Sequence, residues 1–160
     1  MKSALPVSSK RKTPDKDTGQ FPIAGIGASA GGLEALEQLL SSVPENSGIA
    51  YVVIQHLDPT QQGFLPELLQ RITRMKVFLV KDRMPVRPDC VFVIPPNKSM
   101  SILKGVLHLF DPVEARGLRL PVDFFFHSLA EDCKELGIGI VLSGMGSDGS
   151  AGLRTIKEKN

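Results

Sequence analysis

The sequence lacks several features by which other classes of protein are recognised. Its 160 residues contain no Trp, one Tyr and only 2 Cys. Cys90 and Cys133 are too few for a disulfide framework, and neither has a second cysteine at the C-x-x-C spacing of a zinc site. The scarcity of cysteine excludes a disulfide-stapled mini-protein and agrees with a reducing compartment. The sequence therefore predicts a cytoplasmic location.

Long hydrophobic runs are absent as well. The longest uninterrupted run covers residues 49–54, whereas crossing a bilayer takes about 20 apolar residues. The charged N-terminus is not followed by the apolar stretch of a secretory signal. We therefore expect no membrane-spanning segment and no direct insertion into a membrane.

The basic charge excess belongs to one end of the chain. Residues 1–20 carry five Lys or Arg and two Asp, a charge of +3, so the remaining 14 basic and 15 acidic residues carry −1. This leader is rich in Ser, Thr and Pro and poor in large apolar residues, and we expect it to be disordered. A nearly neutral body without Trp offers no basic, aromatic face, so no nucleic-acid partner is predicted.

Beyond the leader, residues 21–160 contain short continuous apolar runs, and between them lie segments whose apolar residues recur at helical spacing. Apolar runs predict strands at 21–26, 49–54, 77–80, 90–94 and 137–142, of which the first and the last are expected to be buried. Apolar residues at helical spacing predict helices at 33–43, 64–72, 122–136 and from about 150. The pair Lys104-Gly105 lies between two further runs and predicts a hairpin at a sheet edge. The predicted fold class is α/β: a doubly wound, mostly parallel sheet with helices on both faces and an edge hairpin, a Rossmann-like three-layer arrangement.

Ligands of such sheets bind in the loops beyond the carboxyl ends of the strands. Three of these loops carry polar or glycine-rich sequence, namely residues 27–32, 55–56 and 143–149. They are therefore the candidate functional segments.

The first of these loops fits two motifs. Residues 25–30 match the dinucleotide fingerprint G-x-G-x-x-G/A, and residues 27–31 match the nucleophile elbow G-x-S-x-G. Dinucleotide binding requires an acidic residue at the end of the second strand, where Gln55-His56 stands instead. A second G-x-G-x-x-G at 144–149 lies eleven residues from the end of the sequence, with no ribose ligand after it. We predict no cofactor and keep dinucleotide binding as an alternative.

Interpretation of the chain as a hydrolase involves all three candidate loops together. Serine catalysis requires an exposed hydroxyl, a histidine that takes its proton, a carboxylate that orients the histidine, and backbone N–H groups facing the oxyanion. Ser29 lies at a sharp turn before a helix, His56 ends the neighbouring strand, and Asp148 follows a later one. The start of the helix after Ser29 can also offer unpaired N–H groups.

Each of these residues also has a structural interpretation. Ser29 can cap the helix that follows it, His56 can be an ordinary loop histidine, and Asp148 can be the N-cap of the last helix. The motif His56-x-Asp58 has metal ligands at a plausible spacing but lacks a third ligand, so no metal is predicted. The two remaining histidines, at positions 108 and 127, lie in a predicted strand and helix and are interpreted as structural or solvated.

The same residues carry a resemblance to a known family. In order along the chain, five segments resemble the catalytic domain of the chemotaxis protein-glutamate methylesterases (CheB type): FPIAGIGASAGG (21–32), VIQH (53–56), VFVIPP (91–96), LPVD (120–123) and VLSGMGSDG (141–149). The resemblance implies a doubly wound α/β domain that hydrolyses glutamate methyl esters on the cytoplasmic helices of chemoreceptors and often deamidates receptor glutamines. It places the nucleophile at Ser29, the base at His56, the orienting carboxylate at Asp148, and the oxyanion-binding amides near Ala30 and Met145.

The sequence departs from this family in three ways. Ala30 stands where the stand-alone enzymes usually have Thr or Ser, so any side-chain hydrogen bond from that position is lost. A leader replaces the N-terminal phospho-receiver domain, and family domains continue past the last helix. We therefore expect residues 21–160 to be a methylesterase-like domain truncated at its C-terminal end, most similar to those that precede a receptor methyltransferase domain in one parent chain. The alternative function is a catalytically inactive regulatory or interaction domain of such a signalling protein.

Overall fold

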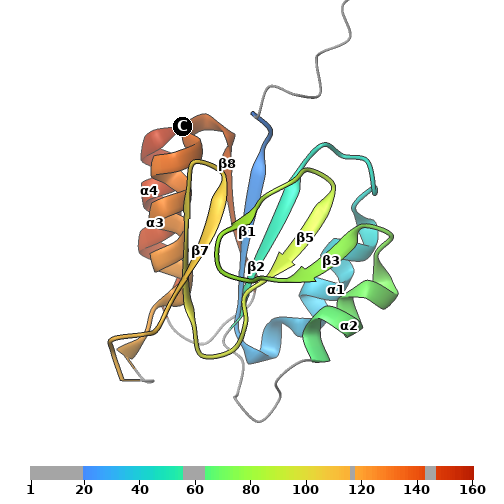
Figure 1. Ribbon diagram of the computed structural model, residues 1–160, viewed down its shortest axis with the longest axis horizontal. Helices are drawn as coiled ribbons and strands as arrows, with labels where there is room; N and C mark the ends of the chain where they lie inside the picture. The colour runs from blue at the N-terminus through green and yellow to red at the C-terminus, as the bar shows by residue number, and fades with distance from the viewer. Residues whose placement is uncertain (1–19, 56–63, 116–117, 143–146) are drawn as a thin grey trace, which may run out of the picture.

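The central layer of the protein is a five-stranded parallel sheet. The structure is a computed structural model that describes residues 20–55, 64–115, 118–142 and 147–160. The strands lie in the order β3-β5-β2-β1-β8 (Figure 1). They are β1 (Ile23–Ala28), β2 (Ala50–Gln55), β3 (Lys76–Leu79), β5 (Cys90–Val93) and β8 (Gly137–Leu142).

Helices cover both faces of this sheet. They are α1 (Leu33–Ser42), α2 (Phe64–Ile72), α3 (Pro121–Cys133) and α4 (Ser150–Lys159), with short 3-10 helices η1 (Ala30–Gly32) and η4 (Lys134–Leu136). Figure 1 shows α1 and α2 on one side of the sheet and α3 and α4 on the other. The doubly wound α/β fold is therefore confirmed. The helix expected over 122–136 ends as an α-helix at Cys133 and continues as η4.

The two faces of the sheet form two separate cores because neighbouring strand residues point to opposite sides. Ala24 and Ile26 of β1 pack with Leu36 and Leu40 of α1 in one core. In the other core, residues of β1 and β2 pack with α3 and with the smaller sheet: Ile23, Val52, Ile54, Phe125, Leu129 and Met100 belong to this cluster. β1 is buried along its whole length, as a central parallel strand requires.

The predicted hairpin forms but does not extend the central sheet. Strands β6 (Ser99–Leu103) and β7 (Val106–Phe110) pair on either side of the 104–105 turn, and β4 (Met84–Pro85) adds to β7 in a separate antiparallel sheet. Met100, Ile102 and Leu107 are buried and belong to the core cluster that also contains α3. The expectation of an edge hairpin on the main sheet is therefore wrong, because this apolar face packs over the sheet instead of beside it.

The glycines of β1 allow α3 to approach the sheet closely. A Cβ atom at Gly27 would lie 2.5 Å from Cγ1 of Val122, and one at Gly25 would lie 2.8 Å from Cε1 of Phe126. These distances are shorter than van der Waals contact, so any side chain there would push α3 away. Helix packing thus accounts for both glycines without a bound dinucleotide.

Searched over the described ranges, the chain contains no helix with the length and hydropathy needed to cross a membrane.

Candidate active site

The candidate site lies at the carboxyl edge of the central sheet, where three strands end at the same level. In the strand register, Ala28 is the last residue of β1 and pairs with Gln55 of β2 and Leu142 of β8. The chain runs from β1 to β2 on one side and returns to β8 on the other, so β1 marks the point where the winding of the sheet reverses. Open α/β sheets bind their ligands outside the strand ends at such a point. The register therefore brings together the three strand ends that precede the candidate loops.

Ser29 is the first residue after β1 and precedes η1. Its backbone is extended, with φ −83° and ψ 175°, and its carbonyl accepts a hydrogen bond from the N–H of Gly32 at 2.8 Å. Although Ser29 occupies the N-cap position, its hydroxyl makes no capping hydrogen bond to η1. The structure thus gives the Ser29 side chain no capping function, and the residue is half-buried at the carboxyl edge of the sheet.

Gln55 links the end of β2 to this turn. Its side-chain Nε2 donates to the carbonyl of Ser29 at 3.4 Å, and the residue is only 8% exposed. Its Oε1 is buried with no hydrogen-bond partner in the described part of the chain. This contact links the last residue of β2 to the turn at Ser29.

Asp148 is held by the first turn of α3. The N–H of Val122 donates to Oδ2 at 3.1 Å, and the N–H of Asp123 donates to Oδ1 at 2.9 Å. A helix start favours a negative charge because its N–H groups are not used within the helix and its dipole is positive there. The interpretation of Asp148 as the N-cap of the last helix is wrong: Gly149 occupies that position in α4, and Asp148 binds a different helix. Two backbone donors therefore orient both carboxylate oxygens.

Asp123 makes the reciprocal contact. Its Oδ1 accepts hydrogen bonds from the N–H of Gly149 at 3.0 Å and from the N–H of Gly152 at 2.7 Å. Asp123 is 7% exposed, and Gly149 adopts a φ of +101°, which few other residues tolerate. The contacts run in both directions: the Asp123 carboxylate binds backbone N–H groups after Asp148, and the Asp148 carboxylate binds backbone N–H groups of α3.

Asp123 was not among the candidate residues from the sequence. The available signal was a Pro followed two residues later by Asp, a pattern typical of a helix start. That pattern indicates where α3 begins but not that the carboxylate reaches residues about 26 positions further along the chain.

The remaining predicted residues divide into those outside the described ranges and those within them. His56, Asp58 and Met145 lie outside the described residues. Ala30 lies in η1 directly after Ser29, so its backbone is at the helix start, as predicted. The other two histidines lie away from the Asp148 turn: His108 is in β7, and His127 is exposed on α3 with its Nδ1 2.9 Å from Oγ1 of Thr155. In the part of the chain that the structure describes, no three His, Cys, Asp or Glu side chains could together hold a metal.

Known proteins share both the sequence and the fold. The profile of the CheB methylesterase family matches residues 24–160. A relative from Leptospira interrogans is 31% identical over 134 residues, which are 83% of this chain and 69% of the relative. A relative from Syntrophomonas wolfei, named protein-glutamate methylesterase/protein-glutamine glutaminase 1, is 32% identical over 161 residues, covering 96% of this chain and 46% of the relative. The chain thus spans less than half of that longer protein.

The solved structures include the Thermotoga maritima CheB methylesterase catalytic domain. It superposes with a TM-score of 0.77 at 28% sequence identity, covering 88% of this chain and 76% of that one. The resemblance stated from the five sequence segments is therefore confirmed by profile, by relatives and by fold. Since the family profile extends over most of the chain and both helix starts of the candidate site lie within it, the chain belongs to the CheB methylesterase family.

Proposed function

We propose that this chain is a serine esterase that hydrolyses glutamate methyl esters of proteins through an acyl-enzyme on Ser29. The family and the names of its members identify the activity as that of a protein-glutamate methylesterase. The observation that carries the assignment of residues is the position of Asp148: two backbone N–H groups orient its carboxylate at the sheet edge where Ser29 follows β1.

In the first half-reaction, the Ser29 hydroxyl attacks the ester carbonyl and His56 takes its proton. The carbonyl oxygen becomes an oxyanion, which the backbone N–H groups of Ala30 and Met145 stabilise. Collapse of this intermediate breaks the bond to the methoxy group, and His56 returns the proton so that methanol leaves. Asp148 holds the imidazole in the tautomer that accepts the proton from serine.

In the second half-reaction, His56 deprotonates a water that attacks the acyl-enzyme. The bond to Ser29 breaks, the serine regains its proton from His56, and a glutamate carboxylate is released. The same route on a glutamine side chain releases ammonia instead of methanol, and relatives are named for this glutaminase activity as well. At position 30 only a backbone N–H contributes, since alanine carries no hydroxyl.

The proposed substrates are methylated chemoreceptors, on the side of the membrane where their cytoplasmic helices lie. This also makes the cytoplasm the proposed location. A methyltransferase domain in the same parent chain stays a prediction, as does the continuation of the domain beyond α4.

The test compares methanol release from methylated receptor by the native chain and by Ser29→Ala. General-base and nucleophilic catalysis together supply well over about 10³-fold, so the variant should be inactive within detection. Ser41→Ala, an exposed serine on α1, is the matched control and should retain full activity. A serine-reactive phosphonate should label the native chain and Ser41→Ala but not Ser29→Ala.

Equal methanol release by the native chain and Ser29→Ala would contradict the proposal. If the native chain binds receptor but neither releases methanol nor reacts with the phosphonate, the alternative of an inactive regulatory domain holds instead.

A further inference from the structure

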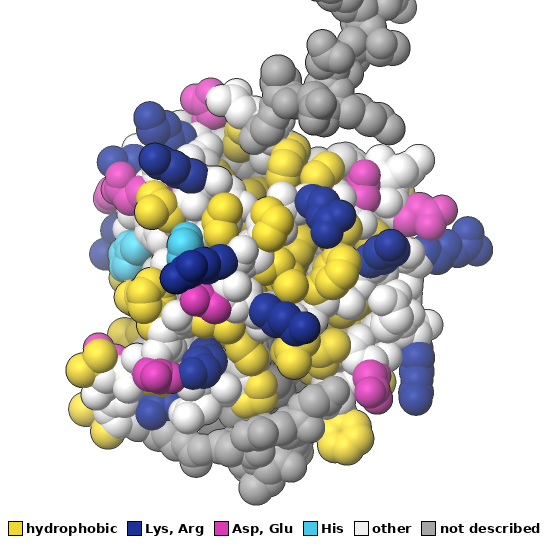
Figure 2. Space-filling model, viewed as in Figure 1, with side chains coloured by type: hydrophobic (Ala, Val, Ile, Leu, Met, Phe, Trp, Pro, Cys, Tyr) yellow, Lys and Arg dark blue, Asp and Glu magenta, His cyan; other side chains and the backbone are white. Residues whose placement is uncertain are grey.

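Five large apolar side chains are exposed on one short stretch of the chain, at the end of β7 and the beginning of α3. We call Phe110, Val113, Leu118, Leu120 and Phe124 the 110–124 surface. Their exposed fractions are 47%, 95%, 73%, 50% and 46%. In Figure 2, hydrophobic side chains show at the projecting lower-left corner, where Figure 1 places the segment between β7 and α3. Single exposed apolar residues are ordinary, but a contiguous group indicates a binding surface.

This surface has a defined shape. The rings of Phe110 and Phe124 meet edge to face, with centroids 6.1 Å apart and an interplanar angle of 79°. They contribute to the lining of an open cleft of about 550 Å³, which Val113, Leu118, Leu120 and Pro121 also line. The aromatic pair therefore forms one side of the cleft without a bound partner.

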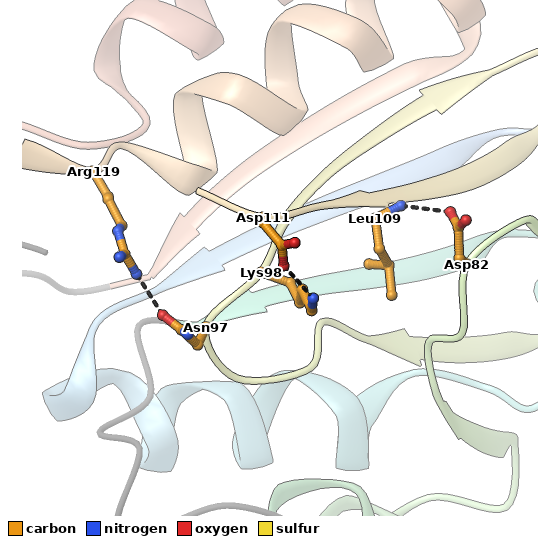
Figure 3. A network of polar contacts seen from close by, with 6 residues as sticks. All are labelled: Asp82, Asn97, Lys98, Leu109, Asp111 and Arg119. Carbon is orange, nitrogen blue, oxygen red and sulfur yellow. Dashed lines mark hydrogen bonds and ion pairs between the residues drawn. The ribbon is translucent and has the colours of Figure 1, made fainter. Parts of the chain in front are cut away.

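Polar contacts attach the segment to the rest of the protein (Figure 3). Arg119 donates through Nη1 to Oδ1 of Asn97 at 2.6 Å and through Nε to the carbonyl of Glu114 at 2.8 Å. Nearby, Lys98 forms an ion pair with Asp111. These bonds tie the segment to the turn after β5, so the exposed apolar residues belong to an anchored segment.

Arg119 also brings a positive charge to the surface. Both hydrogen-bond acceptors named above are neutral, an amide and a backbone carbonyl, and among the described residues no ion pair of Arg119 is found. Arg119 lines the same cleft as the aromatic pair and is half-buried. The carboxylates of Asp111, Glu114 and Asp123 line the same cleft, but Asp111 is paired with Lys98 and Asp123 accepts backbone hydrogen bonds at a buried position. The guanidinium of Arg119 offers one position for a carboxylate from outside the chain.

The 110–124 surface is continuous with the candidate active site. Pro121 and Asp123 line the cleft, while the N–H groups of Val122 and Asp123 hold Asp148 on the inner side of the same helix turn. A molecule bound to the surface therefore lies next to the catalytic carboxylate. The γ-methyl ester is too small to distinguish a protein substrate from any other ester, so recognition of the protein requires contacts beyond the ester.

We propose that the 110–124 surface docks the protein segment that flanks the esterified glutamate. This inference rests on the proposed function and names the recognition surface of the same site. The partner is an amphipathic segment that places apolar side chains against Phe110, Leu118 and Phe124 and a glutamate carboxylate on Arg119.

The kinetic test compares two substrates, methylated receptor and the methyl ester of a blocked single glutamate. The variants are Leu118→Ser and Arg119→Gln. The matched controls are Leu103→Ser, an exposed leucine at the opposite end of the hairpin, and Arg87→Gln at an exposed loop position. Loss of a well-packed contact weakens binding about tenfold. We expect the surface variants to lower the ratio of kcat/KM for receptor to kcat/KM for the small ester about tenfold, through KM.

The binding test removes turnover from the comparison. Each variant is combined with Ser29→Ala, and the dissociation constant for the methylated receptor domain is measured by fluorescence anisotropy. Leu118→Ser and Arg119→Gln should each raise it about tenfold, and the controls should leave it unchanged. This result stands whether or not the native chain hydrolyses esters, so failure of the proposed function is recognised separately.

Two outcomes overturn the inference. In one, the surface variants and their controls have the same dissociation constant and the same substrate ratio. In the other, sedimentation shows that the native chain is a dimer that Leu118→Ser dissociates, which makes the surface a contact between two copies of the chain.

Discussion

Two helix starts at the carboxyl edge of the sheet differ in what binds their backbone N–H groups. At α3, the N–H groups of Val122 and Asp123 donate to Asp148 at 3.1 and 2.9 Å. After β1, the N-cap residues of η1 and α1 are Ser29 and Gly32, and neither supplies a side-chain capping hydrogen bond. One start thus holds a carboxylate in place, and the other lacks a capping side chain beside the proposed nucleophile. The comparison suggests that the fixed start orients a catalytic group while the uncapped start receives the oxyanion.

The largest change in activity is expected when the carboxylate bound at the start of α3 is removed. Asp148→Ala should reduce kcat for methanol release by about 10³- to 10⁴-fold, because the histidine loses its orienting partner. It should also lower the free energy of unfolding by about 1–2 kcal/mol, the value of a lost helix cap.

Asp148→Asn separates these two effects. The amide oxygen still accepts one N–H from α3, so most of the stability should return, measured by urea unfolding. The negative charge does not return, so kcat should stay low. Nearly native activity in Asp148→Asn would show that the carboxylate only caps α3.

The next largest effect is expected at Asp123. Asp123→Ala leaves the N–H groups of Gly149 and Gly152 without their buried acceptor, which costs about 1–3 kcal/mol of folding stability. The turn that carries Asp148 then loses its attachment to α3, and we expect kcat to fall about 10- to 100-fold with little change in KM. Asp123→Asn keeps an acceptor oxygen and should restore kcat. If Asn and Ala lower kcat equally, Asp123 acts through its charge and not through these two hydrogen bonds.

A smaller effect should follow from adding a charge at the uncapped start. Gly31 is exposed, and a Cβ there meets no described atom within 4 Å, so a side chain fits. In Gly31→Asp the carboxylate lies in the first turn after Ser29 and opposes the negative charge that develops on the ester oxygen. We expect kcat to fall about tenfold relative to Gly31→Asn, which has the same size without the charge. The difference should shrink in high salt because the charge is exposed. Equal kcat values for the two variants would place the oxyanion away from this helix start.

Much of the fold was predictable because its signals are local. The five apolar runs became five parallel strands, although the edge strands β3 and β8 are only partly buried, and the Lys104-Gly105 turn became the β6-β7 hairpin. The sheet to which the hairpin belongs was not predictable, since it depends on packing of residues such as Met100 against distant elements. Strand pattern alone does not encode that choice.

In the candidate site, too, features with a local signal were predictable and long-range contacts were not. The positions of Ser29 and Asp148 after their strands followed from the rule that parallel strands end at one edge, and the register agrees with it. The alternative interpretation of Asp148 as a helix cap named the wrong helix, because an aspartate before a helix usually caps that helix. The actual donors to Asp148 lie about 26 positions earlier in the chain, at a distance that no local pattern reports. The glycines of β1 were likewise explained only by the closeness of α3.

The smallest effect is expected at the far end of α3, where the helix carries no part of the proposed site. Burial raises the pKa of the Cys133 thiol to about 11, with a smaller contribution from the charge of Asp132. At pH 8 the thiolate fraction is then about a hundredfold below that of an ordinary thiol, and the greater nucleophilicity of a more basic thiolate recovers about tenfold. In a Cys90→Ser background, iodoacetamide should therefore modify Cys133 about tenfold more slowly than it modifies the unfolded chain. The rate should still be rising between pH 9 and pH 11, where that of an ordinary thiol levels off. Cys133→Ser should leave methanol release unchanged, because the proposed catalytic carboxylate is bound at the start of α3. A loss of activity as large as that of Asp123→Ala would mean that the whole helix, and not its first turn, positions Asp148.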